Sequence, residues 1–349
     1  MYYFHNDYNE TCHPAVTAKI LASSTNQFDG YGMDESCKRA AALIRKECGR
    51  EDASVHFLVG GTQTNLTVIA ASLRPYQGVL AATTGHINVH ETGAIEATGH
   101  KVIQLPGYNG KLTSQQVESA VLEQRNSPDA EHIVQPKMVY ISNPTEYGTT
   151  YSLAELEALA SVCRAHNLFL FIDGARLGYA LASENYDVTM ADIARLADVF
   201  YIGGTKVGAM FGEALVITNS IIAEDFRYMI KQHGAMLAKG WLLGLQFEAL
   251  FEDGLYTKIS HHADVLADSL RKTLQELNCP LVCKNKTNQV FVTLPNTVLA
   301  KLANEFTFAV WEIADNEQTT VRFCTSWATQ VEAVTLLCAR LKELIFLEL

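Results

Sequence analysis

Short apolar segments alternate with amphipathic segments along the first 250 residues of the chain. Most of the short segments are apolar at nearly every position instead of at alternate positions. This pattern is typical of strands that helices cover on both faces. We therefore predict a mostly parallel sheet of seven strands, at residues 54–59, 78–83, 101–106, 137–142, 168–173, 198–203 and 213–218.

The segments between these strands carry the signals that begin helices. Ser152 and Glu155 have the spacing of a capping box, and Thr113 and Gln116 repeat it. Apolar residues of the segment 152–167 fall on one helical face. This alternation of strands and helices predicts a doubly wound α/β domain.

The pattern changes after residue 250. The remaining segments predict a helix, two strands and a last helix, at 261–277, 288–295, 319–326 and 331–341. The change divides the chain into a predicted N-terminal arm, a large α/β domain and a small α+β C-terminal domain, at residues 1–30, 31–250 and 251–349.

The composition, with 48% hydrophobic and 19% charged residues among 349, is that of a globular protein. A net charge of −11 makes nucleic acid and anionic membranes poor candidate partners. No apolar run reaches the ~18 residues of a membrane helix, and the first residues do not resemble a signal peptide. The 8 cysteines form no C-x-x-C pattern, which suits a reducing compartment. We expect a soluble cytoplasmic protein.

The turn after the first predicted strand suits an anion. Gly60 and Gly61 let backbone amides approach a bound group, and Thr62 begins a helix whose N-terminal N–H groups attract negative charge. A phosphate fits this turn, although a plain tight turn explains the same residues. The sequence has neither the G-x-G-x-x-G fingerprint nor a P-loop, which disfavours a nicotinamide dehydrogenase.

Two charged side chains lie at the ends of apolar strands. Asp173 stands where open α/β sheets bind ligands, and it requires a cation, a protonated ring nitrogen or several donors. An internal ion pair with Arg176 is the alternative. Lys206 lies between two apolar strands, where dry surroundings lower a lysine pKa, as in lysines that form Schiff bases. A strand-end lysine that reaches water is the alternative.

Three more side chains have candidate chemistry. His86 suits stacking on a flat ring or proton transfer near neutral pH. His86 and His90 would share a helical face and so allow a zinc site, but no third ligand is indicated and we assign no metal. Arg322 lies on a late strand among apolar neighbours, so it requires a carboxylate from an internal acid or a substrate.

These groups together describe one ligand. A phosphate suits the glycine turn, a ring nitrogen suits Asp173, an aldehyde suits Lys206, a flat ring suits His86 and a carboxylate suits an arginine. Pyridoxal 5′-phosphate (PLP) together with an amino acid has all five features.

The motifs that contain these residues resemble the threonine aldolases, a branch of the fold-type-I PLP-dependent enzymes. The resemblance covers nearly the whole chain, in family order, through DGYGMDE, GGTQTN, GHINVHETGA, PTEYGTTY, IDGAR, GGTKVGA, GEALV and RFCTSWAT. It implies a transferase-like α/β fold and cleavage of L-threonine, L-allo-threonine or phenylserine-like amino acids to glycine and an aldehyde. A β-eliminating lyase or a racemase on the same scaffold, or a PLP-binding protein without turnover, are the alternatives.

The resemblance also implies roles for the candidate residues. Lys206 would bind the cofactor covalently, and Asp173 would hold its pyridine nitrogen. His86 would stack on the ring and is the candidate base for the β-hydroxyl proton, directly or through water. Arg176, beside the cofactor, and Arg322 would hold the substrate carboxylate.

Other roles concern the phosphate and a second subunit. Gly61 and Thr62 would bind the phosphate, with Thr205 as a further hydroxyl. The resemblance implies a homodimer or homotetramer whose sites lie at a dimer interface. Tyr31 would reach the substrate site of a neighbouring subunit, and Lys239 would help with phosphate across that interface.

Two positions depart from the family pattern. Gly60 replaces the usual serine or threonine and removes one hydroxyl from the phosphate site. Asn6-Asp7 replaces the usual Ser-Asp pair, and Asn6 is expected near the substrate, where its greater length would change the fit.

Overall fold

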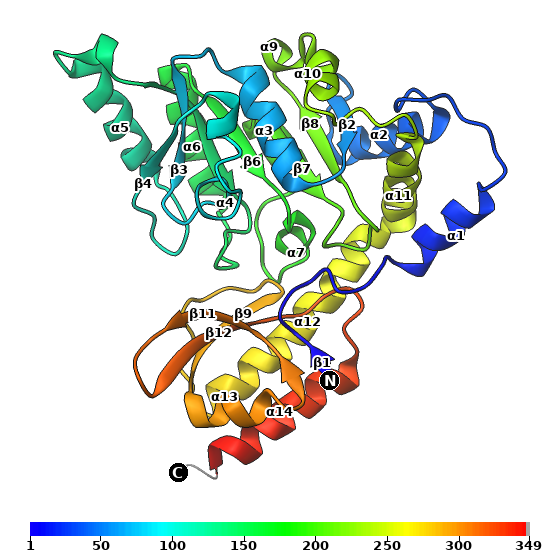
Figure 1. Cartoon of the computed structure of the whole chain (residues 1–349), viewed down its shortest axis with the longest axis vertical. Coiled ribbons are helices and arrows are strands. Elements are labelled where there is room, and N and C mark those ends of the chain that lie inside the picture. The colour runs from blue at the N-terminus through cyan, green and yellow to red at the C-terminus, as the bar shows by residue number, and fades with distance from the viewer. Residues whose placement is uncertain (347–349) are drawn as a thin grey trace.

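The computed structural model describes residues 1–346, shown in Figure 1. Within this range a seven-stranded sheet has the spatial order β2-β8-β7-β6-β5-β3-β4. All the strands predicted for it are confirmed, with bounds β2 (Ser54–Leu58), β3 (Gln77–Ala82), β4 (Val102–Leu105), β5 (Gln135–Ser142), β6 (Phe169–Asp173), β7 (Val199–Gly203) and β8 (Glu213–Ile217).

The sheet is mostly parallel, as predicted. Each pair from β4 to β7 is parallel, whereas β8 is antiparallel to both β7 and β2. Strand β2 therefore runs in the same direction as β7. The carboxyl ends of these strands and the start of β8 meet at one edge, which is where open α/β sheets bind ligands.

Helices cover both faces of the sheet, which explains the nearly continuous apolar strands (Figure 1). One face packs against α3 (Gly61–Ser72), α9 (Ser220–Ala223) and α10 (Phe226–Gln232). The other packs against α2 (Glu35–Cys48), α5 (Ser114–Asn126), α6 (Leu153–His166), α8 (Met190–Leu196) and α11 (Trp241–Phe251). Both predicted capping boxes are present, at the starts of α5 and α6.

Shorter helical segments lie in the connections. They are α4 (His86–Val89), η1 (Glu96–Thr98), η2 (Ala130–His132), α7 (Leu177–Leu181) and η3 (Glu252–Gly254). In the described part of the chain, none of the helices combines the length and apolar character that crossing a membrane requires.

A smaller α+β unit follows, as predicted. Its antiparallel sheet has the order β11-β12-β9, with bounds β11 (Ala309–Ile313), β12 (Gln318–Cys324) and β9 (Gln289–Pro295). Helices pack on it through a separate core: α12 (Leu255–Glu276), which extends from the large sheet, α13 (Asn296–Leu302) and α14 (Val331–Phe346) (Figure 1). The sequence did not predict β11, because three of its five residues are exposed and the other two are only partly buried.

The N-terminal segment joins the two parts. Strand β1 (Tyr2–Tyr3) pairs with β10 (Phe306–Thr307), and Phe4 is buried in the small core. Helix α1 (Pro14–Ala22) packs instead against α11 of the large part (Figure 1). Residues between β1 and α1 therefore cross the space between the two sheets. The exact division at residues 30 and 250 stays a prediction.

Candidate active site

The predicted chemistry gathers at the carboxyl edge of the large sheet. Gly61 follows β2, His86 follows β3, Asp173 ends β6, Lys206 follows β7 and Glu213 begins β8. A cavity of about 300 Å³ lies at this edge and is lined by all five residues. The strand order therefore brings together segments that are distant in the sequence.

Lys206 follows two glycines that allow close backbone packing. A Cβ atom on Gly203 would lie 2.1 Å from the carbonyl oxygen of Ala175, and one on Gly204 would lie 2.6 Å from that of Gly212. Because backbone oxygens cannot move aside cheaply, larger residues here would displace the turn that carries the lysine. The glycines thus fix the position from which Lys206 enters the cavity.

The surroundings of Lys206 alter its charge. Burial lowers its pKa and the nearby Arg176 lowers it further, whereas Asp7, Asp173 and Glu213 oppose this effect. Burial raises the pKa of Glu213, and the nearby Lys206 lowers that pKa by a smaller amount. The lysine pKa is lowered as the sequence predicts, and a neutral amine is the form that attacks an aldehyde.

Asp173 stands in a network of buried polar groups. Its Oδ2 accepts hydrogen bonds from Tyr140 Oη (2.5 Å) and Asn65 Nδ2 (3.2 Å), and its Oδ1 accepts one from Ala175 N (3.0 Å). Asn65 Nδ2 also donates to Glu91 Oε1 (2.7 Å), which lies 2.8 Å from His86 Nδ1. One network from α3, β5 and β6 therefore positions both Asp173 and His86.

Arg176 pairs with Asp7, and the alternative of an ion pair with Asp173 is wrong. Its Nε and Nη2 donate to Asp7 Oδ2 (2.7 Å) and Oδ1 (2.9 Å), and Asn288 Nδ2 donates to Oδ2 (2.8 Å). Burial alone would raise the pKa of Asp7, but Arg176, Lys206 and Asn288 together hold it below its ordinary value. The N-terminal arm thus supplies a buried carboxylate that fixes Arg176 beside Lys206.

The start of α3 forms an open cradle. Gly60 is the N-cap residue and makes no side-chain cap, so the N–H groups of the first turn remain available to a ligand. A Cβ atom on Gly60 would meet nothing within 4 Å, whereas one on Gly61 would lie 3.0 Å from Tyr201 Oη. Thr62 and Thr205 line the same cavity. These features fit a phosphate group.

A second cavity of about 540 Å³ adjoins the first and shares its lining residues Tyr8, His86, Glu146, Arg176 and Lys206. Arg322 lies on its far side, where Nη1 donates to Gln289 Oε1 (3.1 Å) and Nη2 to His5 O (3.0 Å). The buried Nε of Arg322 has no hydrogen-bond partner in the range 1–346. Arg322 lines this cavity, so its positive charge favours an anionic ligand there.

Three predicted residues do not line these two cavities. The Asn6 side chain accepts a hydrogen bond from Tyr8 N (3.0 Å), and Tyr8 lines the cavities instead. Lys239 is exposed ahead of α11. Tyr31 is 48% exposed and lines a separate cavity of about 240 Å³.

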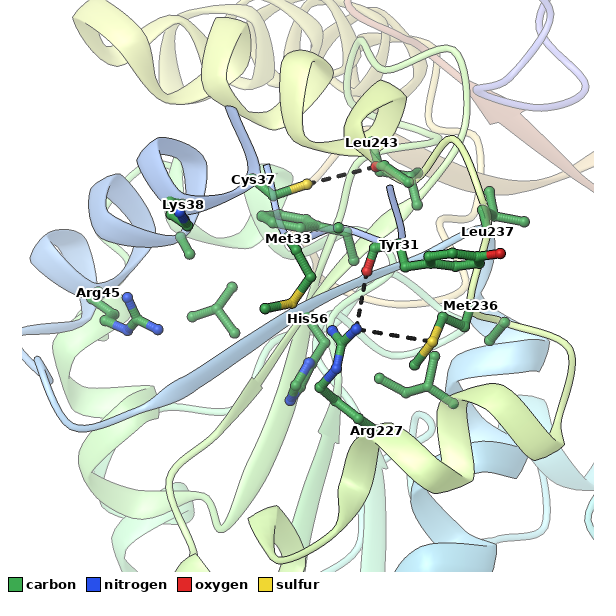
Figure 2. A pocket seen from close by; sticks show the side chains of 17 residues that line it. Tyr31, Met33, Cys37, Lys38, Arg45, His56, Arg227, Met236, Leu237 and Leu243 are labelled. Carbon is green, nitrogen blue, oxygen red and sulfur yellow. Dashed lines mark hydrogen bonds between the residues drawn. The ribbon is translucent and has the colours of Figure 1, made fainter. Parts of the chain in front are cut away.

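The separate cavity lies beside α2, β2 and α10. Figure 2 shows Arg227 within it, next to His56 and Met236, and its Nη2 donates to Tyr31 O (3.1 Å). Loss of contact with water lowers the pKa of His56 to about 4, with a smaller contribution from Arg227. Lys206, Asp173 and His86 do not line this cavity, so it is distinct from the candidate active site.

Sequence reasoning missed several cavity-lining residues, namely Tyr8, Glu146, Tyr201, Glu213 and Trp311. Glu213 left a signal, since it is an acidic residue that opens an otherwise apolar strand. Glu146 also left one, because it follows the carboxyl end of a parallel strand. No metal-binding group of three or more His, Cys, Asp or Glu side chains occurs in the described structure.

Comparison with known proteins decides the family. A model of the beta-eliminating lyase family matches residues 11–297. A low specificity L-threonine aldolase from Pseudomonas sp. (strain NCIMB 10558) is 30% identical over 346 residues, covering 97% of this chain and 96% of the relative. The chain belongs to the beta-eliminating lyase family, in its threonine aldolase branch. It is therefore an enzyme, a PLP-dependent lyase.

Further similarities support this threonine aldolase family assignment. A low specificity L-threonine aldolase from Pseudomonas aeruginosa is 28% identical over 333 residues, covering 94% of this chain and 93% of the relative. A solved structure described as a Leishmania major threonine aldolase has a TM-score of 0.96 and 46% identity, and covers 99% of this chain and 100% of that one.

Likeness to a more distant solved structure concerns the fold alone. An aspartate aminotransferase from Thermus thermophilus has a TM-score of 0.70 at 16% identity, covering 98% of this chain and 91% of that one. The predicted fold-type-I architecture is thereby confirmed. The lysine, the Asp173 network and the uncapped start of α3 fit the aldehyde, ring nitrogen and phosphate of PLP.

Proposed function

We propose that this enzyme cleaves β-hydroxy-α-amino acids of the L-threonine, L-allo-threonine or phenylserine type to glycine and an aldehyde. The observation that carries the proposal is the pair of adjoining cavities that places Lys206 and the guanidinium group of Arg322 around one continuous space. An amine suits a cofactor aldehyde, and an arginine suits the carboxylate of an amino acid. The names of the relatives support this substrate class.

The cofactor-holding residues follow from the first cavity. Lys206 would hold the PLP aldehyde carbon, and the carboxylate of Asp173 would hold the protonated ring nitrogen. His86 would lie against the ring, with Glu91 fixing its orientation at 2.8 Å. When bound, PLP supplies an electron sink for the bond that breaks at Cα.

The phosphate would lie at the start of α3. Gly60, Gly61 and Thr62 would offer backbone N–H groups, with the hydroxyls of Thr62 and Thr205 beside them. Thr205 Oγ1 lies 3.0 Å from Glu213 Oε1, so this hydroxyl is held in place by the strand that follows. Placement of the phosphate at a helix start also favours its negative charge.

The two arginines would orient the substrate. Arg322, which lines the second cavity, would bind the carboxylate, while Arg176 has Nε and Nη2 committed to Asp7 and keeps Nη1 for a ligand. With the substrate carboxylate held by Arg322, the β-substituent would face Tyr8 and Trp311, which line the same cavity. We propose that this wall, together with Asn6 behind Tyr8, determines which β-substituents fit.

The assembly is part of the same proposal. Tyr31 and Lys239 lie outside the two active-site cavities of their own chain, which is the position required of residues that reach a neighbouring site. We propose a cytoplasmic homodimer or homotetramer in which both residues complete the partner's site. Mixed dimers of Lys206→Ala and Lys239→Ala chains should regain activity that neither variant shows alone, whereas no recovery would contradict shared sites.

The substrate test uses the PLP-loaded enzyme with L-threonine, L-allo-threonine and L-phenylserine. We expect aldehyde and glycine to appear in equal amounts from at least one of them. The family model also covers β-eliminating lyases, and release of ammonia with a keto acid would favour that reaction. Interconversion of enantiomers without cleavage would indicate a racemase, and either result would overturn the proposed reaction.

A further inference from the structure

Glu146 lies where the two cavities of the candidate active site meet. Its Oε1 accepts hydrogen bonds from Ser142 Oγ (2.6 Å) and from the backbone N of His86 (3.0 Å). Both of these hydrogen bonds reach Oε1, and Glu146 lines both cavities together with Lys206 and Arg176. One carboxylate oxygen is thus anchored while the other is available to a ligand.

The turn that carries Glu146 is held rigidly. Thr145 and Thr149 join across it through their side chains (2.7 Å), and Gly148 N donates to Thr145 O (2.8 Å). From the small domain, Thr287 Oγ1 donates to Gly148 O (2.9 Å). Because both domains fix this backbone, the carboxylate is positioned before any ligand binds.

The charge state of Glu146 suits proton transfer. Burial raises its pKa above the ordinary carboxyl value, and the hydrogen bond from Ser142 opposes this rise. A carboxylate with a raised pKa is a stronger base than an exposed one. The titratable and charged groups that face it are His86 from α4, Tyr140 from β5, Asp173 from β6, Tyr151 beyond the turn, and Arg176 and Lys206 across the cavity.

We propose that Glu146 accepts the proton of the substrate's β-hydroxyl group during cleavage. This inference rests on the proposed function. The O–H bond of the substrate breaks and an Oε2–H bond forms on Glu146, the hydroxyl carbon becomes the aldehyde carbonyl, and bound PLP would supply the acceptor for the electron pair of the broken Cα–Cβ bond. In the reverse direction Glu146 returns the proton.

The geometry favours Glu146 over His86 for this step. His86 Nδ1 is committed to Glu91 at 2.8 Å, and a ring that stacks on a cofactor turns its face, not its nitrogens, toward it. Glu146 instead lies beside His86 on the boundary with the cavity of Arg322, where a substrate held by that arginine would lie. His86 then contacts the ring and Glu146 handles the proton.

The first experiment compares Glu146→Gln with wild type in the PLP-loaded enzyme. We expect kcat for L-threonine or L-phenylserine cleavage to fall about 100- to 10,000-fold, the usual contribution of a general base. Glycine has no β-hydroxyl group, so its binding constant, measured by calorimetry, should stay within about twofold. Glu146→Asp, which shortens the side chain, should retain an intermediate rate.

Two controls separate this role from a structural one. Glu123→Gln removes one carboxylate from the exposed face of α5 and should leave both rates and glycine binding unchanged. Thermal unfolding midpoints and PLP binding of all variants should match wild type. An inactive wild-type enzyme would contradict the proposed function itself. If the wild type is active and the Glu146→Gln variant is equally active, only this inference is overturned.

The pH profile gives a second, independent readout. Cleavage requires the ionised carboxylate, so kcat/KM of the wild type should fall as the pH drops through the raised pKa of Glu146. Ser142→Ala removes a hydrogen bond that favours the ionised form, so the acid limb should move to higher pH. An acid limb that stays at the wild-type position in Ser142→Ala would overturn the assignment.

Discussion

The two ends of the active-site cavity differ in how the charged groups that face a ligand are held. At the cofactor end, Asp173 accepts hydrogen bonds from Tyr140, Asn65 and Ala175, and His86 is held by Glu91. At the substrate end, both hydrogen bonds to Glu146 reach Oε1, and the buried Nε of Arg322 has no partner in the range 1–346. The cofactor end also holds two buried oxygens without a partner in that range, Asn65 Oδ1 and Glu91 Oε2, so the contrast concerns the carboxylates of Asp173 and Glu146. The carboxylate of Asp173 is preorganised for one ligand, whereas Glu146 keeps one oxygen for a ligand that enters and leaves.

The ends also come from different parts of the chain. The large sheet supplies Asp173, His86 and Lys206, whereas the substrate end combines Glu146 with Arg322 and Trp311 of the small domain and Tyr8 of the arm. Small movements between the domains would therefore change the substrate end most. The difference teaches that cofactor chemistry and substrate choice can vary separately on this scaffold.

The largest predicted effect comes from the lysine that both cavities share. Lys206→Ala should lower turnover of β-hydroxy amino acids by at least about a thousandfold, because Lys206 is the one lysine of residues 1–346 that lines the two cavities. Steady-state aldehyde release measures this effect. Near wild-type turnover would mean that the cofactor end is wrongly placed.

The next effect concerns the Asp7–Arg176 pair, which joins the arm to the cavity. Asp7→Asn should lower the free energy of unfolding at neutral pH by about 3–5 kcal/mol, because it leaves a buried arginine without its carboxylate. The folded-state pKa of Asp7 lies below its ordinary value of 3.8, so this stabilisation is present above that value. It is lost as the pH falls through the folded-state pKa.

Denaturant unfolding of wild type and Asp7→Asn at neutral and acidic pH measures this difference, which should shrink in acid. Asp52→Asn is the matched control, because it removes an exposed carboxylate that pairs with Arg50 at the surface. A difference between wild type and Asp7→Asn that is independent of pH would show that charge pairing does not stabilise this junction.

Arg322→Ala sharpens the comparison between the ends. It should weaken substrate binding by about 2–5 kcal/mol, since a carboxylate loses its charged partner. The effect should appear mainly in KM, while PLP affinity stays near wild type. If PLP affinity fell as much as substrate affinity, the two ends would not be separable in the way that the cavities suggest.

The smallest effect is a gain at the cofactor end. Gly60→Ser places a side chain where a Cβ atom meets nothing within 4 Å. One added hydrogen bond to phosphate should strengthen PLP binding by about 0.5–1.5 kcal/mol. Gly61→Ala is the contrasting variant, because its Cβ would lie 3.0 Å from Tyr201 Oη, and it should weaken binding. PLP titrations measure both affinities. Equal changes in PLP affinity in the two variants would contradict the assignment of the phosphate site to the start of α3.

The sheet and the cofactor end could be predicted from the sequence for physical reasons. Buried parallel strands are continuously apolar, and ligand-binding residues follow their carboxyl ends, so Asp173 and Lys206 stood out. Short, partly exposed β11 gave no such pattern, and Trp311 was missed with it. Asp7 was not predicted as a partner of Arg176 because only the fold brings the arm to the sheet.

The most direct test of the account is the site of cofactor attachment. The PLP-loaded enzyme is reduced with borohydride, digested and mapped by mass spectrometry. We predict that the reduced cofactor is found on Lys206 and that Lys206→Ala carries none, while Lys239→Ala is labelled as wild type is. Labelling of a different lysine, or no labelling of a yellow wild-type enzyme, would contradict the placement of the active site at the edge between β7 and β8.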